Sequence, residues 1–394
     1  MLGGPFSPWP SFSQEEAEIV QRVLLSNKVN YWTGDEGRNF ETEFAEWCGT
    51  EYAVAVANGT VALDLAWKAL GIGDGDEIIV TPRTFIASIS SIVNAGAVPV
   101  FADVDPDSQN ITPETVAPVM TPRTRAILCV HLAGWPCDMD GFRYLLSNTG
   151  GSNIRLVEDC AQAHGAHYKG RPVGGLGDIG CWSFCQDKIM TTGGEGGMVT
   201  TDDRGLRNAM WAYKDHGKSW EAVYEREHPP GFRWVHDGFG TNWRMAEMQS
   251  AIGRFQLTRM EDWHAARARN SSEILAAARS CPALRVPDLP GSIEHGWYKC
   301  YVFVRPEVLA EGWSRDRIID ELNDRGVPCR SGSCSEVYLE HAFDQTRFKP
   351  ATRLPVARQL GETSLMFLVH PTLTKAEIGL SCEVLRSVME AASS

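Results

Sequence analysis

The chain lacks the segments that would direct it into or across a membrane. No run of about 18 or more apolar residues occurs in its 394 residues, although a helix that spans a bilayer needs about 20. Its first residues, MLGGPFSPWPSF, contain no basic segment followed by an apolar stretch, which is the pattern of a secretory signal peptide. We therefore expect no signal peptide, no membrane span and a cytoplasmic location.

Positive charge is scarce as well. The chain carries 37 lysines and arginines against 50 aspartates and glutamates, which gives a net charge of −13 at pH 7. Proteins that bind nucleic acid or an anionic membrane need a basic patch, so we expect neither kind of partner. An anionic small molecule would have to be bound by local groups.

The eleven cysteines form no recognisable metal-binding or redox pattern. No CxxC pair occurs, and Cys329 and Cys334 have four residues between them with no second pair of ligands nearby. Structural zinc sites need such pairs. We expect reduced, mostly buried thiols and no metal site.

What the chain does have is a regular alternation of short apolar strands and helices. This alternation is typical of an α/β protein whose mostly parallel sheet is covered by helices on both faces. Two helices precede it, one after the candidate N-cap Ser13 and one that ends at Gly49. The patterns predict strands over 52–56, 77–80, 98–104, 126–131 and 155–157, and helices over 17–25, 40–48, 61–70, 86–95 and 140–147.

The alternation weakens after about residue 255. The patterns there predict helices over 248–278, 315–325 and 375–392 and a strand over 298–304. We therefore predict two domains. Residues 1–255 would form an N-terminal segment and a large domain, and residues 256–394 a smaller C-terminal α+β domain.

Ligands of open α/β sheets bind at the carboxyl ends of the strands, and two segments there could contact a phosphate or a ring. Asn58-Gly59-Thr60 stands between a strand and a helix, where glycine lets the backbone approach a phosphate and the helix offers free N–H groups. A plain turn with a threonine cap is the alternative. Phe85 is placed either to stack on a planar cofactor or to join the core. Arg83 suits a phosphate or carboxylate, or a surface ion pair.

Two further segments combine acid, amide and amine groups. In EDCAQ, the Asp159 carboxylate could hold a proton on a ring nitrogen while Gln162 reaches the same ring. An acidic pair at a strand end is the alternative. In SFCQDKIMTTGGEGG, which begins at Ser183, Lys188 is followed by apolar residues and a glycine cluster. A lysine becomes a nucleophile when burial or a nearby cation lowers its pKa, so this context favours a reactive lysine over a solvated one.

Taken in chain order, these segments resemble the DegT/StrS family of pyridoxal phosphate (PLP)-dependent aminotransferases. The most specific stretch covers residues 157–201, which contain the family's E-D-x-A-Q-A-H-G and S-F-x-x-x-K…G-E-G-G elements. The resemblance implies the type I aminotransferase fold with PLP as the cofactor. Lys188 would carry PLP as a Schiff base and shuttle a proton, and Asp159 would pair with the ring nitrogen. The other cofactor contacts would be Gly59, Thr60 and Ser183 to the phosphate, Gln162 beside the 3-hydroxyl and Phe85 on the ring face.

A later segment resembles the family in a way that concerns assembly. NWRM, which begins at Asn242, matches the family's N-Y-R-M/L motif with tryptophan in place of tyrosine. In the family this asparagine reaches the phosphate in the neighbouring subunit, which implies a homodimer with shared active sites. Some members are dehydratases with histidine at the lysine position, so Lys188 implies transamination. L-glutamate or L-glutamine would donate the amino group, and a ketone would accept it in a ping-pong reaction.

The acceptor is less closely defined by the sequence. Tyr298, Arg330 and Arg83 are candidate acceptor contacts. The two arginines favour a nucleotide-diphosphate keto-sugar, because its pyrophosphate needs cations. The lead-in GGPFSPWPSF resembles members that act on cyclitols or aminoglycoside precursors, so a cyclitol ketone is the alternative. A PLP-bound regulatory protein without turnover and a cofactor-free structural homologue are the alternatives from other classes.

Overall fold

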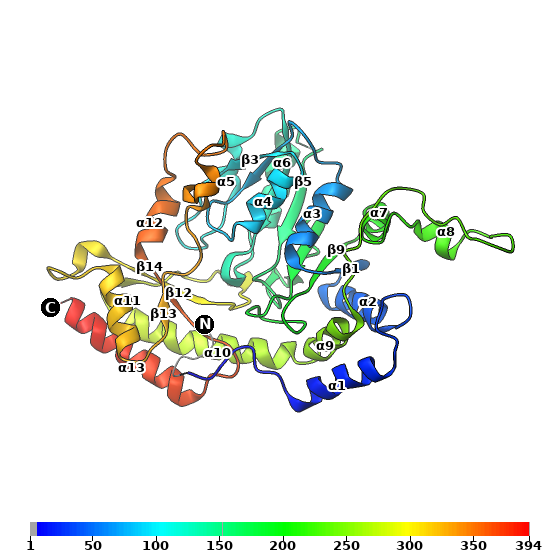
Figure 1. Cartoon of the computed structure of the whole chain (residues 1–394). Coiled ribbons are helices and arrows are strands. Elements are labelled where there is room, and N and C mark those ends of the chain that lie inside the picture. Colours follow the sequence, from blue (N-terminus) through cyan, green and yellow to red (C-terminus); the bar gives the residue numbers. More distant parts are fainter. Residues whose placement is uncertain (1–5, 152, 394) are drawn as a thin grey trace.

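A seven-stranded sheet forms the centre of the larger part of the molecule (Figure 1). The computed structural model describes residues 6–151 and 153–393. Six strands of this sheet run in one direction and β9 runs against them, so the predicted mostly parallel sheet is confirmed. In spatial order the strands are β1 (Tyr52–Val56), β9 (Gly197–Thr201), β8 (Ile179–Ser183), β5 (Arg155–Asp159), β4 (Thr124–Val130), β2 (Glu77–Val80) and β3 (Val98–Phe101).

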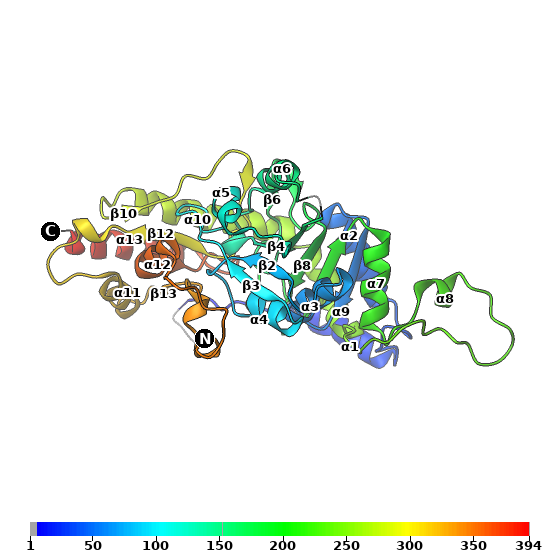
Figure 2. The same cartoon turned by 90° about the horizontal axis from the view of Figure 1, so that it is seen from above.

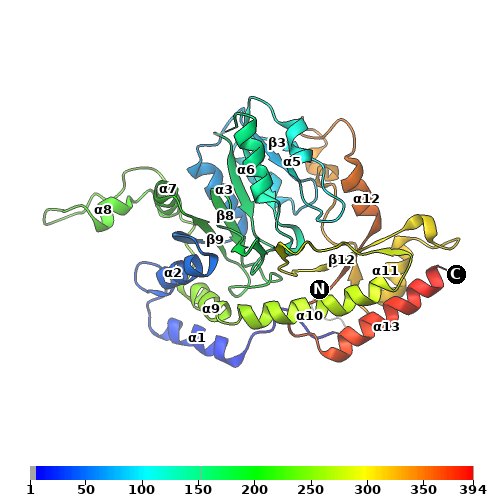
Figure 3. The ribbon, with the colours of Figure 1, turned by 180° about the vertical axis from the view of Figure 1, so that it is seen from behind.

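Apolar side chains project from both faces of this sheet, which agrees with the prediction that helices cover it on both sides. In β2, Ile78 and Val80 belong to one buried cluster and Ile79 to another, because successive side chains of a strand point to opposite faces. Helices α3 (Gly59–Ala69), α4 (Ala87–Asn94) and α7 (Arg204–Lys214) contribute to the first cluster. Helices α2 (Glu36–Cys48) and α6 (Met139–Asn148) contribute to the second. Figures 1 and 3 show α3 and α6 on opposite sides of the sheet.

A second, antiparallel sheet lies in the C-terminal part of the chain, with its own buried cluster. Its strands, in order, are β10 (Leu284–Arg285), β12 (Cys300–Val304), β14 (Ser364–Phe367) and β13 (Cys329–Arg330). Helices α10 (Met260–Arg279), α11 (Arg315–Asp324) and α13 (Lys375–Ala392) also contribute to that cluster, and Figure 3 shows α10 and α13 side by side. The division at residues 255 and 256 stays a prediction.

Short elements connect these layers. A separate three-stranded sheet joins β11 (Ile293–Glu294) to β6 (His167–Tyr168) and β7 (Arg171–Pro172), and thereby links C-terminal residues to the segment between β5 and β8. Among the described residues, no helix has both the length and the apolar character needed to cross a membrane. The other helices are α1 (Gln14–Leu25), α5 (Pro113–Val116), α8 (Trp220–Tyr224), α9 (Glu247–Leu257) and α12 (Pro355–Thr363), with 3-10 turns at Ala117–Val119, Leu132–Gly134, Pro306–Val308, Val337–Leu339 and His341–Phe343.

Residues 218–241, here called the arm, extend away from the body beside α7 (Figures 1 and 2). The base of the arm is tied by main-chain hydrogen bonds, since the Ser219 N–H donates to the Val235 carbonyl at 2.8 Å. On the same segment, Phe232 and Trp234 pack edge to face with ring centres 4.8 Å apart, and both are largely exposed. Three large aromatic side chains, with Phe239 as the third, therefore lie outside any core on this segment.

One predicted element is wrong in its extent. The single helix over 248–278 is two helices, because α9 ends at Leu257 and α10 begins at Met260. The Thr258 hydroxyl donates to the Phe255 carbonyl at 2.7 Å, and this side-chain bond competes with the helical bond at the break. Predicted bounds elsewhere agree within a few residues, and those of β1, β2 and α13 agree fully.

Candidate active site

The loop between β8 and β9 carries Lys188 at the carboxyl edge of the large sheet. The loop turns back on itself with Gly193 and Gly194 at φ 88° and 130°, conformations that favour glycine. Lys188 is partly buried, and its ammonium lies 5.0 Å from the centre of the Tyr298 ring. From outside the loop, the Trp9 indole N–H donates to the Lys188 carbonyl at 2.8 Å, which fixes the main chain at the lysine.

Asp187 and Tyr298 set the charge beside this lysine. The Tyr298 hydroxyl donates a hydrogen bond to the Asp187 carboxylate. Burial raises the pKa of Tyr298 well above its usual value, and the Asp187 charge adds to this effect. Although burial opposes it, the charge of Lys188 and the Tyr298 hydroxyl lower the pKa of Asp187. At neutral pH the lysine therefore has an ionised carboxylate and a neutral phenol as neighbours.

Asp159 ends strand β5 at the same edge. One carboxylate oxygen accepts from the Ser88 hydroxyl at 2.8 Å and the other from the Ala161 N–H at 3.1 Å. Ser88 is held in turn by Thr84, at 2.9 Å between hydroxyl oxygens. The carboxylate is 7% exposed and an ionised carboxylate accepts about four hydrogen bonds, so Asp159 is oriented and can still accept a proton-bearing ring nitrogen.

The first turn of α3 lies directly against Ser183. A Cβ built on Gly59 would stand 2.5 Å from the Ser183 Cβ, so only glycine permits this approach. The helix is capped by the Asn58 side chain, which accepts from the Val61 N–H at 2.9 Å; the alternative of a Thr60 cap is thus wrong. The N–H groups of Gly59 and Thr60 precede the capped one, and with the Ser183 hydroxyl they form a donor set suited to a phosphate.

Gln162 and Tyr298 are aligned by one turn after β4. The Gln162 side-chain oxygen accepts from the Ala133 N–H at 2.9 Å, and the Ala133 carbonyl accepts from the Tyr298 N–H at 2.9 Å. Gln162 therefore offers its amide N–H groups to a ligand. Since both residues are bonded to Ala133, the backbone of Tyr298 has a fixed position relative to the Gln162 side chain.

The remaining predicted residues differ in their exposure and in whether they line a cavity. Phe85 is 67% exposed on the loop between β2 and α4, so it is not a core aromatic. Asn242 is exposed at the base of the arm, and Arg330 on β13 lines the cavity described below. Arg83 differs from the prediction: it is fully buried, donates to Gln109 at 3.0 Å and Ser364 at 2.9 Å, and is neither a surface ion pair nor a cavity residue.

A cavity of about 820 Å³ opens next to Lys188. Sequence reasoning found Tyr298 and Arg330 in its wall but missed Trp9, Arg267 and Lys299. No local pattern distinguishes these three residues, because their burial depends on contacts between segments far apart in the chain. All eleven cysteines are free, and all except Cys185 and Cys334 are buried, which confirms the predicted thiols.

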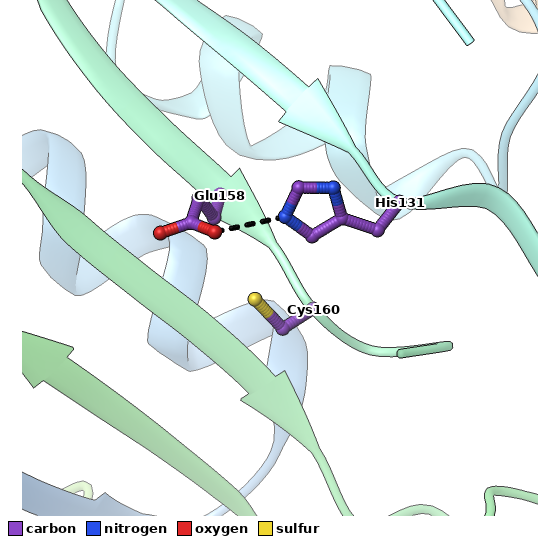
Figure 4. Close-up of side chains that lie close together, drawn as sticks. All are labelled: His131, Glu158 and Cys160. Carbon is purple, nitrogen blue, oxygen red and sulfur yellow. Dashed lines mark hydrogen bonds and ion pairs between the residues drawn. The ribbon is translucent and has the colours of Figure 1, made fainter. Parts of the chain in front are cut away.

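His131, Glu158 and Cys160 lie together under this edge, with possible ligand atoms within 4.8 Å of one another (Figure 4). The His131 Nε2 lies 2.9 Å from a Glu158 oxygen, and its Nδ1 accepts from the Cys137 N–H at 3.0 Å. Burial raises the pKa of Cys160, so its sulfur stays a thiol. The glutamate also accepts from the backbone N–H groups of Gly174, Leu176 and Gly177 at 2.7–2.9 Å. Because the His131 ring and the Glu158 carboxylate are already hydrogen-bonded, the pair braces β4 and β5.

This edge fits a PLP group. A tight helix N-terminus with a serine suits its phosphate, an oriented carboxylate suits its ring nitrogen, and a lysine amine suits its aldehyde carbon. The layered sheet with these groups at its carboxyl edge is the type I fold of PLP-dependent aminotransferases. The chain belongs to the DegT/DnrJ/EryC1/StrS aminotransferase family, whose model matches residues 10–386. The protein is therefore an aminotransferase with PLP as its cofactor.

Individual relatives resemble the chain along nearly its whole length. It is 34% identical over 363 residues to dTDP-3-amino-3,4,6-trideoxy-α-D-glucose transaminase of Streptomyces venezuelae, covering 92% of this chain and 89% of the relative. It is 34% identical over 378 residues to GDP-perosamine synthase of Escherichia coli O157:H7, covering 95% of each. The crystal structure of an aminotransferase from Psychrobacter cryohalolentis matches it with a TM-score of 0.96 at 62% identity, over 99% of this chain and 100% of that one.

Proposed function

We propose that this aminotransferase moves an amino group from L-glutamate or L-glutamine to the ketone of a nucleotide-diphosphate-linked sugar, in a ping-pong reaction within the cytoplasm. The observation that carries the proposal is the meeting of Lys188, Asp159 and Ser183 with the α3 N-terminus at one sheet edge. The relatives named for dTDP- and GDP-linked sugars support the class of acceptor. Eleven free thiols accord with a reducing compartment.

Each residue has a separate task in this proposal. PLP, when bound, serves as an electron sink and carries the amino group between the two substrates. Asp159 keeps the ring nitrogen protonated, while the Gly59 and Thr60 N–H groups and the Ser183 hydroxyl hold the phosphate. Phe85 covers one ring face, and Gln162 donates to the 3-hydroxyl side. The Lys188 amine would move a proton from the α-carbon of the donor to C4′ of the cofactor, with the Asp187 carboxylate stabilising its charged form.

We also propose that the active unit is a homodimer with two shared sites. The exposed aromatic residues of the arm and the exposed Asn242 at its base support a surface that a second copy covers. Asn242 would contact the phosphate held by the other subunit.

The reaction is tested by incubating the PLP-loaded protein with L-glutamate or L-glutamine and a panel of nucleotide keto-sugars and inososes, with release of the 2-oxo acid as the readout. We expect release with a nucleotide keto-sugar, and none from Lys188→Ala. Turnover of inososes alone would assign a cyclitol acceptor instead. A cofactor absorbance that no amino donor changes would identify a protein that binds PLP without turnover.

Sharing of the sites is tested by mixing two inactive variants. Lys188→Ala lacks the reactive amine, and Asn242→Ala lacks the phosphate contact. In a mixed dimer, one of the two sites has both residues intact, so activity should reappear when the subunits exchange. A mixture that stays inactive, although mass measurement shows mixed dimers, would contradict the shared site.

A further inference from the structure

Positive charge collects in the cavity beside Lys188, in a chain that is acidic as a whole. Arg267, Lys299 and Arg330 line this cavity of about 820 Å³, and Asp187 is the one acidic residue among its lining residues. That carboxylate already accepts from Tyr298. The lining is therefore net positive, although the chain carries a net charge of −13.

Arg267, on helix α10, carries a buried guanidinium whose N–H groups are only partly hydrogen-bonded. It is 1% exposed, and its Nη1 donates to the Trp297 carbonyl at 3.2 Å. Its Nε and Nη2 have no hydrogen-bond partner within the part of the chain that the structure describes. Burial lowers the pKa of Arg267 to about 9, so it is still charged at neutral pH. Such a group is costly unless a ligand completes its hydrogen bonds.

Lys299 brings a second cation close to the reactive amine. Its ammonium lies 4.6 Å from the centre of the Tyr298 ring, and that of Lys188 lies 5.0 Å from the same centre. Burial lowers the pKa of Lys299 to about 8; Asp187 opposes this shift, while the charges of Arg267, Lys188 and Arg330 add to it. The two lysines therefore share one aromatic ring, which places the cation pair beside the reacting groups.

The N-terminal segment closes this corner of the cavity. Trp9 lies under the Arg267 guanidinium at 5.1 Å and stacks on His370 with ring centres 6.0 Å apart. Burial lowers the pKa of His370 to about 3, and the charges of Arg267 and Lys299 add to the shift. His370 is therefore a neutral wall and supplies no counter-charge, so Arg267 and Lys299 carry the charge of this corner.

We propose that Arg267 and Lys299, with Arg330 at the rim, form a subsite that binds an oxyanion of a substrate. The Nε and Nη2 atoms of a guanidinium form a fork that matches two oxygens of a carboxylate or a phosphate. The oxyanion is either a carboxylate of the amino donor or the diphosphate of the acceptor. This inference rests on the proposed function and adds to it the residues that recognise charge on the substrates.

The test uses the PLP-loaded protein, so that the phosphate site at α3 is already filled. Succinate stands for the donor carboxylates and inorganic pyrophosphate for the acceptor diphosphate, and titration calorimetry measures the affinity of each. The variants are Arg267→Met and Lys299→Met. Arg269→Met is the matched control, because Arg269 lies on the same helix but is exposed. We expect each cavity variant to bind at least one probe about 30-fold more weakly, the lower limit for removing one partner of a buried charged pair, and the control to bind as the wild type does.

The pattern of losses assigns the source of the oxyanion. Loss of succinate binding alone assigns the donor, loss of pyrophosphate binding alone assigns the acceptor, and loss of both assigns one subsite used in both half-reactions. The subsite is refuted if the wild type binds neither probe, or if both cavity variants bind both probes as the wild type does. Should Arg267→Met fail to fold, as judged by its unfolding midpoint, Lys299→Met and Arg267→Lys complete the test.

Kinetics separate this inference from the proposed function. Substituting a subsite residue should raise KM for L-glutamate or for the keto-sugar by a larger factor than it lowers kcat. If the wild-type protein binds a probe through Arg267 but transfers no amino group, the subsite would stand and the proposed function would be refuted. If the wild-type protein transfers the amino group and the cavity variants bind both probes as tightly as it does, the function would stand and the subsite would be refuted.

Discussion

Substituting Gly59 by alanine should weaken cofactor binding without unfolding the protein. The added Cβ would stand 2.5 Å from the Ser183 Cβ and 3.1 Å from its Cα, whereas apolar carbons pack at about 3.5–4.0 Å. Either α3 or β8 must then move by about 1 Å. A movement of that size breaks a hydrogen bond of ordinary length to the phosphate, which costs about 1.5–3 kcal/mol for a charged acceptor. PLP affinity should therefore fall by about 10- to 150-fold.

The measurement is PLP affinity by absorbance titration of the apoprotein, with urea unfolding of the same samples. Gly73→Ala is the control, because nothing lies within 4 Å of a Cβ at Gly73, and it should bind PLP as the wild type does. Overpacking at Gly59 should cost about 1–3 kcal/mol of stability, partly offset by the better helix propensity of alanine. If Gly59→Ala binds PLP with unchanged affinity, the phosphate does not lie at this helix N-terminus.

Three further changes test other parts of the site. Asp159→Asn cannot hold a proton on the ring nitrogen and should lower kcat/KM by at least about 10²-fold, whereas Ser88→Ala, which only loosens the carboxylate, should lower it less; equal losses would contradict the assignment. Lys299 has a pKa of about 8 in the folded chain against 10.5 for a free lysine, so the unfolded chain binds more protons between these values. Its contribution to stability should then rise by on the order of 3 kcal/mol from pH 8 to pH 10.5, seen as a difference in urea unfolding that is absent from Lys299→Met. Glu158→Gln places an amide donor against groups that donate to Glu158 and should cost about 3–5 kcal/mol in urea unfolding; an unchanged midpoint would show that the cluster is no brace.

Local patterns were sufficient for the elements whose ends depend on neighbouring residues. Helix α1 begins after Ser13 because the Ser13 and Glu16 side chains cap each other's backbone, and α2 ends at Gly49 because that residue has φ 66°. Strands β8 and β9 were not predicted as strands. Their segments contain the glycines and polar residues of the Lys188 motif, and both are fully buried by helices distant in the chain.

The residues of the candidate site likewise fall into those that local motifs reveal and those that only tertiary contacts place. Lys188 and Asp159 stand in sequence elements that a family motif contains, so the sequence could single them out. Arg267 stands on a helix with little amphipathic character, and Trp9, which covers it, is 258 residues away. Arg83 shows the opposite error, since a charged residue near the ligand edge is buried between Gln109 and Ser364. Only tertiary contacts decide which arginine faces the cavity.

The turn after β4 couples the two halves of this site. Its Ala133 N–H holds Gln162 on the cofactor side, and its Ala133 carbonyl holds the Tyr298 backbone on the cavity side. The turn cannot easily shift, since a Cβ on Gly134 would stand 2.8 Å from the Trp297 nitrogen. Tyr298 in turn orients Asp187 through its hydroxyl, and the ammonium groups of Lys188 and Lys299 lie 5.0 Å and 4.6 Å from its ring centre. Because one turn sets both distances, the proposed cofactor contact of Gln162 and the proposed oxyanion subsite would keep a fixed spacing, as the proposed use of one site by two substrates in succession requires.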